Sequence, residues 1–265
     1  MLVKLLKYEI KATARIFIPF YLFLILFTLI NKIFISMNSS FLDIPKSIAM
    51  GIFVFTVIGI FVMTLIMTIQ RFYKNLLTDE GYLSFTLPVK SHHHIISKAI
   101  VALMWFFLDV IIIGLAIFFM VTNVEVIANM IPGINYIIDY LHEIGPITLI
   151  IAMQILIIII MAVFNLLIKI YAAISMTNFT DNYKILLGLG SYIGFDIAEQ
   201  TITSLLFILI GVVGPIKVFE LYNLNTITPG IIITALFCYM ILLAIIGSVY
   251  FFITNWILKN KLNLE

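Results

Sequence analysis

The strongest constraint on the fold of this chain of 265 residues is a set of six long apolar runs, separated by polar connections. A helix needs roughly 20 residues to cross a hydrocarbon core of about 30 Å, and each run is long enough. Transmembrane strands would alternate apolar and polar residues over segments of about ten residues, a pattern that the sequence lacks. The runs predict an all-α integral membrane protein with six transmembrane helices, at residues 16–35, 48–70, 95–122, 147–168, 185–213 and 231–253.

The composition supports one transmembrane domain over residues 1–265. Hydrophobic residues make up 63% of the chain and charged residues 11%, whereas about a quarter of a soluble domain is charged. The basic start lacks a small-residue cleavage site, so we expect a retained first span instead of a signal peptide. The single cysteine, Cys238, excludes an internal disulfide.

Residues 1–15 predict an amphipathic helix that lies in the membrane interface. Its basic residues recur at spacings of three, four and four, which puts them on one helical stripe: Lys4, Lys7, Lys11 and Arg15. Apolar residues occupy the other side, where Glu9 and Thr13 interrupt them. Such a helix places its lysines among anionic lipid head groups. The alternative is a simple cytoplasmic flank of the first span.

The positions of lysine and arginine predict the orientation. With the N-terminus inside, the outer side holds Lys32, Lys46 and Lys217, and the cytoplasmic side holds the other 12 of 15 basic residues. Because cytoplasmic loops carry the excess of positive charge, we expect both termini in the cytoplasm. Residues 123–146 carry acids and no basic residue, which suits a short helix on the outer leaflet.

Acidic side chains inside the predicted spans are candidates for a translocation pathway. An ionised acid at bilayer depth costs about 3 kcal/mol on insertion scales, so it normally faces a cavity or a partner. The candidates are the acids Asp109, Asp196 and Glu199, together with the amides Asn165 and Gln200. Hydrogen bonding between helices is an equal alternative. A proton relay lacks an intramembrane basic partner or histidine in the predicted spans.

The sequence predicts no catalytic, metal or nucleic-acid site. The phosphate-binding pattern Gly-x-x-x-x-Gly-Lys-Ser/Thr does not occur. The adjacent histidines at 92–94 point about 100° apart on a helix, which prevents them from converging on one ion. Gly190 and Gly194 match the small-x-x-x-small pattern of closely packed membrane helices.

The most polar segment is the predicted cytoplasmic loop at residues 71–94. Thr78 precedes Asp79 and Glu80, which suits a helix that starts with acids in its first turn. Aromatic and apolar side chains follow, and Pro88 ends the segment. Inserted aromatic side chains often anchor protein interfaces, so the loop predicts a short docking helix.

The stretch Arg71-Phe-Tyr-Lys…Asp79-Glu80-Gly81-Tyr82-Leu83…Thr86-Leu87-Pro88-Val89 resembles the loop between the second and third helices of bacterial ABC-2-type permeases. The basic start and the closing Asn255-Trp256-Ile257-Leu258-Lys259 are also similar to that family. The resemblance implies a multi-pass protein of the bacterial cytoplasmic membrane. It also implies pairing with a second permease subunit, identical or homologous, and with separate ATPase subunits that hold ATP and Mg. The coupling helix would then comprise Asp79, Glu80, Gly81, Tyr82, Leu83 and Phe85, and residues 1–15 would form an elbow-like helix.

These expectations favour the permease subunit of an ATP-driven exporter for a peptide, antimicrobial, lipid-like or drug-like cargo. This chain has shorter outer loops than the larger members of the family. One alternative is an ion-coupled secondary transporter that uses Asp109, Asp196 and Glu199. That class often shows repeat symmetry, and the sequence has no convincing internal repeat. The other is a membrane scaffold or sensor that recruits a soluble protein through the loop.

Overall fold

The structure is a computed structural model that describes residues 2–37, 40–78, 81–82, 86, 90–144, 146–180, 182–213 and 229–260. In these ranges the chain is helical and contains no strand. The long helices are α1 (Leu2–Ser36), α2 (Asp43–Leu77), α4 (Ser91–Val121), α5 (Val124–Ile144), α6 (Pro146–Met176), α7 (Lys184–Val213) and α9 (Pro229–Asn260). Two 3-10 turns, η1 (Ser40–Leu42) and η2 (Thr177–Phe179), join neighbouring helices.

Five helices in the described ranges are long and apolar enough to cross a membrane: α1, α2, α4, α6 and α9. The all-helical membrane class is therefore confirmed, and the chain is a multi-pass membrane protein. The predicted fifth span, residues 185–213, is the helix α7, but α7 is not among the five.

The helices extend past the predicted spans at their polar ends. The prediction of residues 48–70 corresponds to α2 at Asp43–Leu77, and that of residues 147–168 to α6 at Pro146–Met176. At 1.5 Å per residue, the 35 residues of α2 extend over about 52 Å, well beyond a hydrocarbon core of about 30 Å. Hydropathy marks the apolar part of each helix and misses the turns that continue it.

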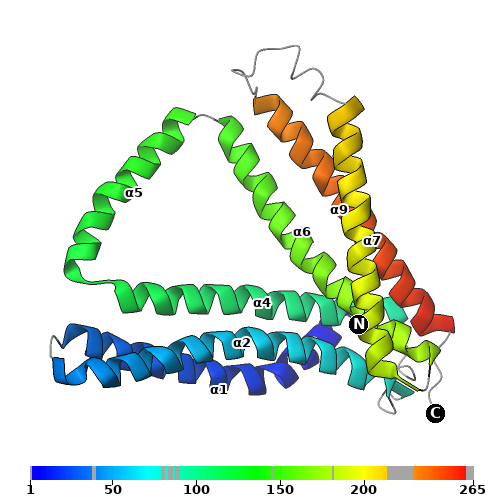
Figure 1. Cartoon of the computed structure of the whole chain (residues 1–265), viewed down its shortest axis with the longest axis horizontal. Helices are drawn as coiled ribbons and strands as arrows, with labels where there is room; N and C mark the ends of the chain where they lie inside the picture. Colours follow the sequence, from blue (N-terminus) through cyan, green and yellow to red (C-terminus); the bar gives the residue numbers. More distant parts are fainter. Residues whose placement is uncertain are drawn as a thin grey trace. The chain divides into compact units, whose positions relative to one another are not determined.

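The chain forms two compact units, and the first comprises Met1–Phe72 and Pro88–Glu143. Here α1, α2 and α4 lie side by side (Figure 1), around a core that includes Phe17, Ile60 and Trp105. Contacts between α1 and α4 join residues that are 87 to 92 positions apart along both helices. A constant separation means that these two helices run parallel.

The helix α2 runs antiparallel to α1 in the first unit. Asn31 donates to the carbonyl of Ala49 near one end, and Arg71 donates to Glu9 near the other. The two residue numbers add to 80 in both pairs, as antiparallel helices require. At the far end of α4, the ammonium of Lys32 donates to the Phe119 carbonyl at 2.9 Å. This bond satisfies one of the last carbonyls of the helix, which have no partner within it.

The second unit comprises Tyr73–Leu87 and Ile144–Glu265 and is built on α6, α7 and α9 (Figure 1). Gln154 of α6 bonds to the Ile233 carbonyl of α9, and Asn165 to that of Leu243, so the two helices run parallel. The helix α7 returns antiparallel along α6, since Lys169 meets Asp196 and Ala173 meets Ser191.

The two units therefore share one arrangement of three helices. In each, the first and third helices run parallel and make the main pairing, α1 with α4 and α6 with α9. The middle helix, α2 or α7, runs antiparallel. The sequence has no convincing internal repeat, but in the structure this order of helices occurs once in each unit.

The predicted interfacial helix at residues 1–15 is not a separate element. It continues without a break into residues 16–35 as the single helix α1. Its apolar side, including Leu6, Ile10 and Ala14, packs against the core of the first unit. The expectation that this side lies in lipid is therefore wrong, because Glu9 and Thr13 bind α2 and α4 and hold it against the protein.

Candidate functional site

Glu9 joins all three helices of the first unit at the end where the loop 71–94 leaves it. Arg71 Nε and Nη2 donate to Glu9 Oε1 and Oε2, each at 3.1 Å, and Lys98 Nζ donates to Oε1 at 3.1 Å. The Glu9 side chain is 13% exposed and that of Lys98 is 7% exposed. We call Glu9, Arg71 and Lys98 the Glu9 clamp. A bidentate Arg–carboxylate contact fixes the relative orientation of the two side chains as well as the distance between them.

Thr13 and Trp105 extend this contact along α1 and α4. The indole Nε1 of Trp105 donates to Thr13 Oγ1 at 2.8 Å, and its ring stacks on Phe17 with centroids 4.3 Å apart. Both Thr13 and Trp105 are buried. The two residues that interrupt the apolar side of the N-terminal segment, Glu9 and Thr13, are thus its tertiary contacts.

The predicted docking helix lies only in part within the described residues. Asp79, Glu80, Leu83 and Phe85 lie outside them. Gly81 and Tyr82 are helical, and the Gly81 N–H donates to the Thr78 carbonyl at 2.7 Å. Tyr82 is 63% exposed, and the docking role of this segment stays a prediction.

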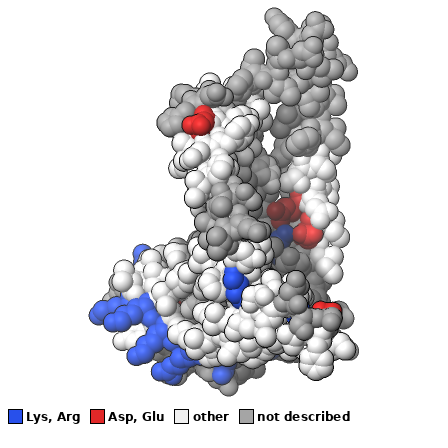
Figure 2. Space-filling view, turned by 90° about the vertical axis from the view of Figure 1, so that its left-hand side faces the viewer, with Lys and Arg blue, Asp and Glu red and all other residues white. Residues whose placement is uncertain are grey.

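The basic stripe of the N-terminal segment is exposed on α1. All four residues face solvent or head groups: Lys4, Lys7, Lys11 and Arg15. Figure 2 shows Lys and Arg side chains gathered in one patch on the face turned to the viewer. The stripe therefore stays available to anionic lipids, although the apolar side of the same helix packs against protein.

Asp109 lies inside the first unit and away from any surface. It is 0% exposed, and its two oxygens accept hydrogen bonds from the Tyr21 hydroxyl and the Thr64 hydroxyl, each at 2.5 Å. One partner comes from α1 and the other from α2. This geometry matches the interhelical alternative, in which the acid ties three helices together instead of lining a pathway.

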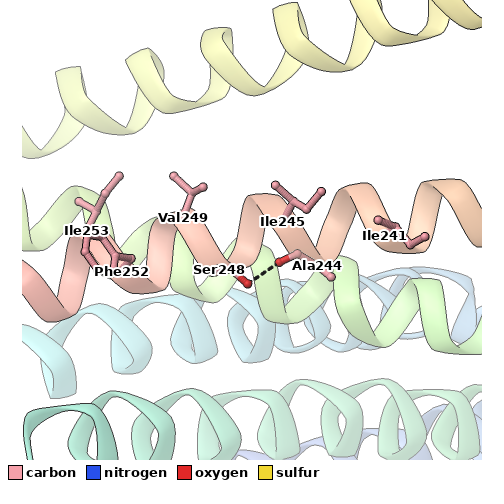
Figure 3. Close-up of a pocket in the computed structure, with 7 residues that line it drawn as sticks. All are labelled: Ile241, Ala244, Ile245, Ser248, Val249, Phe252 and Ile253. Carbon is pink, nitrogen blue, oxygen red and sulfur yellow. Dashed lines mark hydrogen bonds between the residues drawn. The ribbon is translucent and has the colours of Figure 1, made fainter.

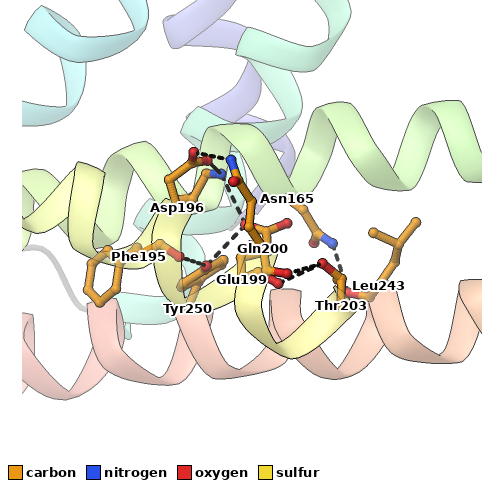
Figure 4. Close-up of polar contacts among 9 residues, drawn as sticks. Asn165, Phe195, Asp196, Glu199, Gln200, Thr203, Leu243 and Tyr250 are labelled. Atoms are coloured by element: carbon orange, nitrogen blue, oxygen red, sulfur yellow. Dashed lines mark hydrogen bonds and ion pairs between the residues drawn. The ribbon is translucent and has the colours of Figure 1, made fainter. Parts of the chain in front are cut away.

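Asn165 makes the corresponding contact in the second unit. Its side-chain amide donates to the Leu243 carbonyl of α9 at 2.8 Å (Figure 4), and the residue is buried. A Cβ on Gly247 would collide with Asn165 Oδ1, so α6 and α9 approach this closely only because residue 247 is glycine. By contrast, no described atom of another helix lies within 4 Å of a Cβ placed on Gly190 or Gly194.

Asp196 and Glu199 share one ammonium, that of Lys169 on α6. Lys169 Nζ donates to Asp196 Oδ1 at 2.7 Å and to Glu199 Oε2 at 3.0 Å. The Tyr250 hydroxyl of α9 donates to Glu199 Oε2 at 3.1 Å, and Gln200 Nε2 donates to Asp196 Oδ2 at 2.9 Å (Figure 4). These five residues form the Lys169 network, which links α6, α7 and α9.

The expectation that the intramembrane acids have no basic partner is therefore wrong. Lys169 directly follows the predicted span 147–168, which puts it in the cytoplasmic flank by sequence. The helix α6 instead continues to Met176, and the Lys169 side chain is only 8% exposed. The apolar residues from 170 to 174 are the signal in the sequence that the helix goes on.

The histidines at 92–94 begin α4, where the rings of His92 and His93 lie 4.3 Å apart. Within the described ranges, no group of three His, Cys, Asp or Glu side chains is placed to hold a metal ion. Comparisons with models of protein families, with curated proteins and with solved structures found no match to this chain. Its function must therefore be argued from the Glu9 clamp and the Lys169 network.

Proposed function

We propose that the chain is the permease subunit of an ATP-driven exporter of the ABC-2 type, with ATP hydrolysed on separate partner subunits. The resemblance of residues 71–89 to the loop of those permeases supports this proposal. In it the chain crosses the bacterial cytoplasmic membrane six times, with both termini inside and α7 as the fifth of the six spans. It pairs with a second permease subunit.

The Glu9 clamp is the observation that carries this proposal. A docking loop can move a membrane bundle only if its ends are firmly joined to the helices that must move. Arg71 lies six residues before the end of α2 and Lys98 seven residues after the start of α4, and both bind Glu9 of α1. A pull on residues 79–85 by an ATPase would therefore act on α1, α2 and α4 together.

The cargo pathway in this proposal lies in the second unit. Asp109 and Asn165 are buried and hydrogen-bonded within their units, which removes them from a pathway. Asp196, Glu199 and Gln200 remain, and the side chains of Asp196 and Glu199 are 39% and 22% exposed. The cargo is a peptide, antimicrobial, lipid-like or drug-like molecule.

An ion-coupled secondary transporter is the second candidate, and two observations favour it. The same order of three helices occurs in both units, and repeated units are common in such transporters. The Lys169 network also supplies the basic partner that a proton relay needs. Uptake driven by a proton gradient in vesicles that contain the purified chain alone would favour this class.

Charge reversal in the loop tests the leading proposal. Glu80→Lys should detach the ATPase partner or abolish its stimulation, while the membrane fold stays intact. Asp139→Lys is the matched control, because Asp139 is an acid on α5, away from the loop in sequence. Unchanged partner binding and ATPase activity in Glu80→Lys would refute the docking role.

A further inference from the structure

The basic stripe of α1 carries positive charge that nothing in the described part of the chain balances. Its four side chains are all exposed: Lys4, Lys7, Lys11 and Arg15. No ion pair between described residues includes any of them. Glu9, which lies among them in sequence, binds Arg71 and Lys98 on the packed side of the helix. The stripe is therefore open to an anionic partner.

The side of α1 that carries the stripe continues as an apolar surface after Arg15. Leu22, Leu26, Leu29 and Ile33 follow Arg15 at spacings of seven, four, three and four, which keeps them on the side of the stripe. These four side chains are 61%, 51%, 49% and 57% exposed, in chain order. One outward face of α1 thus changes from cations to hydrocarbon at Arg15, as a helix surface does where it enters the acyl region of a membrane.

The position of this change decides which cations reach the lipid head groups. Arg15 directly precedes the predicted span 16–35, and Lys11 lies one turn, about 6 Å, before Arg15. The head-group layer on each side of a bilayer is about 5–8 Å thick, so it includes both residues. Lys7 and Lys4 lie about 12 Å and about 16 Å from Arg15 along the helix axis, beyond this layer.

Neither the tilt of the helix nor the direction of its side chains changes this assignment. A typical tilt of about 20° shortens the distances along the membrane normal by only about 6%. Helical side chains lean toward the N-terminus, which directs Lys4 and Lys7 away from the bilayer. The stripe is therefore divided into an inner pair, Lys11 and Arg15, and an outer pair, Lys4 and Lys7.

We propose that α1 binds an anionic phospholipid in the leaflet on the side of its N-terminus, with the phosphate at the inner pair and an acyl chain along Leu22 and Leu26. Arginine suits this position, because its planar guanidinium can donate two parallel hydrogen bonds to a phosphate. The apolar surface next to Arg15 selects a lipid over a soluble anion or an acidic protein, neither of which would contact the leucines. The proposal needs only α1 to cross the membrane, and it is independent of the ATPase and of the cargo.

The outward face of α9 lacks this combination of charge and apolar surface. Ile245, Val249 and Ile253 point to the same side of the helix (Figure 3), and the Ser248 hydroxyl is bonded to the Ala244 carbonyl. Lys259, in the last turn, is the one cation of α9. We therefore expect this face to contact acyl chains without selecting an anionic head group.

A competition between two lipids tests the inference. The full chain is placed in nanodiscs that contain equal amounts of phosphatidylcholine and chain-deuterated phosphatidylglycerol. Native mass spectrometry of the released chain then gives the ratio of the two lipids among molecules with one lipid bound. We expect phosphatidylglycerol to be enriched. Lys11→Gln with Arg15→Gln should lower the ratio by about tenfold or more, since it removes two charged contacts.

The outer pair provides the matched control. Lys4→Gln with Lys7→Gln removes the same two charges from the same stripe and should leave the enrichment nearly unchanged. All four side chains are exposed, so both double variants keep the packed core of the first unit. Free glycerol 1-phosphate, which has the phosphate without acyl chains, should not displace the lipid.

Four results would overturn the inference. They are equal retention of the two lipids by the natural chain, an unchanged ratio in the variant of the inner pair, equal losses in the two double variants, and displacement of the lipid by glycerol 1-phosphate. Equal losses would show that the whole stripe acts, as in a helix that lies flat on the membrane. The measurement uses neither ATP nor an ATPase, so its outcome is separate from that of the permease proposal.

Discussion

Glu9 and Arg71 are joined by two hydrogen bonds of equal length, from Nε to Oε1 and from Nη2 to Oε2, both 3.1 Å. Glu9 belongs to the N-terminal segment for which the sequence predicts a place in the membrane interface. Its partner, Arg71, lies near the end of α2, ahead of the connection to α4. The contact gives the N-terminal segment a role inside the bundle and connects the loop to α1.

Removing the Glu9 carboxylate should destabilise the first unit. Glu9→Gln leaves the positive charges of Arg71 and Lys98 without their shared counter-charge, which we expect to cost about 3 kcal/mol. This free-energy cost is at the low end of the range for breaking a buried ion pair, because the Arg71 side chain is 27% exposed. Trp105, which is buried beside Thr13, reports the unfolding through its fluorescence.

The exposed pair of Asp43 and Lys46 provides the control. Its atoms are 3.9 Å apart and the Asp43 side chain is 70% exposed, so Asp43→Asn should change stability by less than about 1 kcal/mol. Equal effects of Glu9→Gln and Asp43→Asn would show that the Glu9 clamp does not hold the helices.

Gly247 and Asn165 should be energetically coupled. Gly247→Ala places a Cβ against Asn165 Oδ1 and should cost about 1–3 kcal/mol through overpacking. Asn165→Ala removes the clash, so the double variant should be more stable than the sum of the single effects predicts. Gly190→Ala, where nothing lies within 4 Å, is the control. Additive effects of the two changes in denaturation experiments would contradict the close contact.

Loss of Lys169 should harm the second unit more than loss of its whole network. Lys169→Met leaves Asp196 and Glu199 without their shared cation and should lower the stability of the second unit. The triple variant with Asp196→Asn and Glu199→Gln removes all three charges and should recover most of that stability. Thermal unfolding of each purified variant measures this. A triple variant as unstable as Lys169→Met would show that charge balance is not what matters.

Asp109 should act in packing and not in transport. Asp109→Ala removes the buried acceptor of the Tyr21 hydroxyl and should lower stability by about 1–3 kcal/mol. Glu199→Gln, in the network, should instead alter transport more than assembly. The comparison needs the yield of folded protein and a transport rate for both variants. Normal transport by Glu199→Gln would support a purely structural network.

The sequence predicts the helices well because apolar runs directly determine where a chain can cross a membrane. Five of the six predicted spans lie entirely within a helix of the structure, as residues 231–253 lie within Pro229–Asn260. The remaining span, residues 95–122, extends one residue past Ser91–Val121. The ends are less predictable. Hydropathy falls at a lysine such as Lys169, although the backbone stays helical because the lysine has partners on α7.

The site is harder to predict, because its contacts join residues far apart in sequence. Glu9 and Lys98 are 89 positions apart, and Asp109 and Tyr21 are 88 apart. A single sequence shows that an acid lies in an apolar run, but it does not show which helix faces it. The pairing becomes visible only when α1 is placed parallel to α4.

The central claim is that the loop 71–94 docks an ATPase subunit, and purification from the native membrane tests it most directly. The chain is extracted in a mild detergent, and the proteins that co-purify are identified by mass spectrometry. We predict an ATPase subunit with a nucleotide-binding domain, retained by Asp139→Lys and lost from Glu80→Lys. Recovery of the folded chain without any ATPase, or equal recovery with Glu80→Lys, would contradict the account.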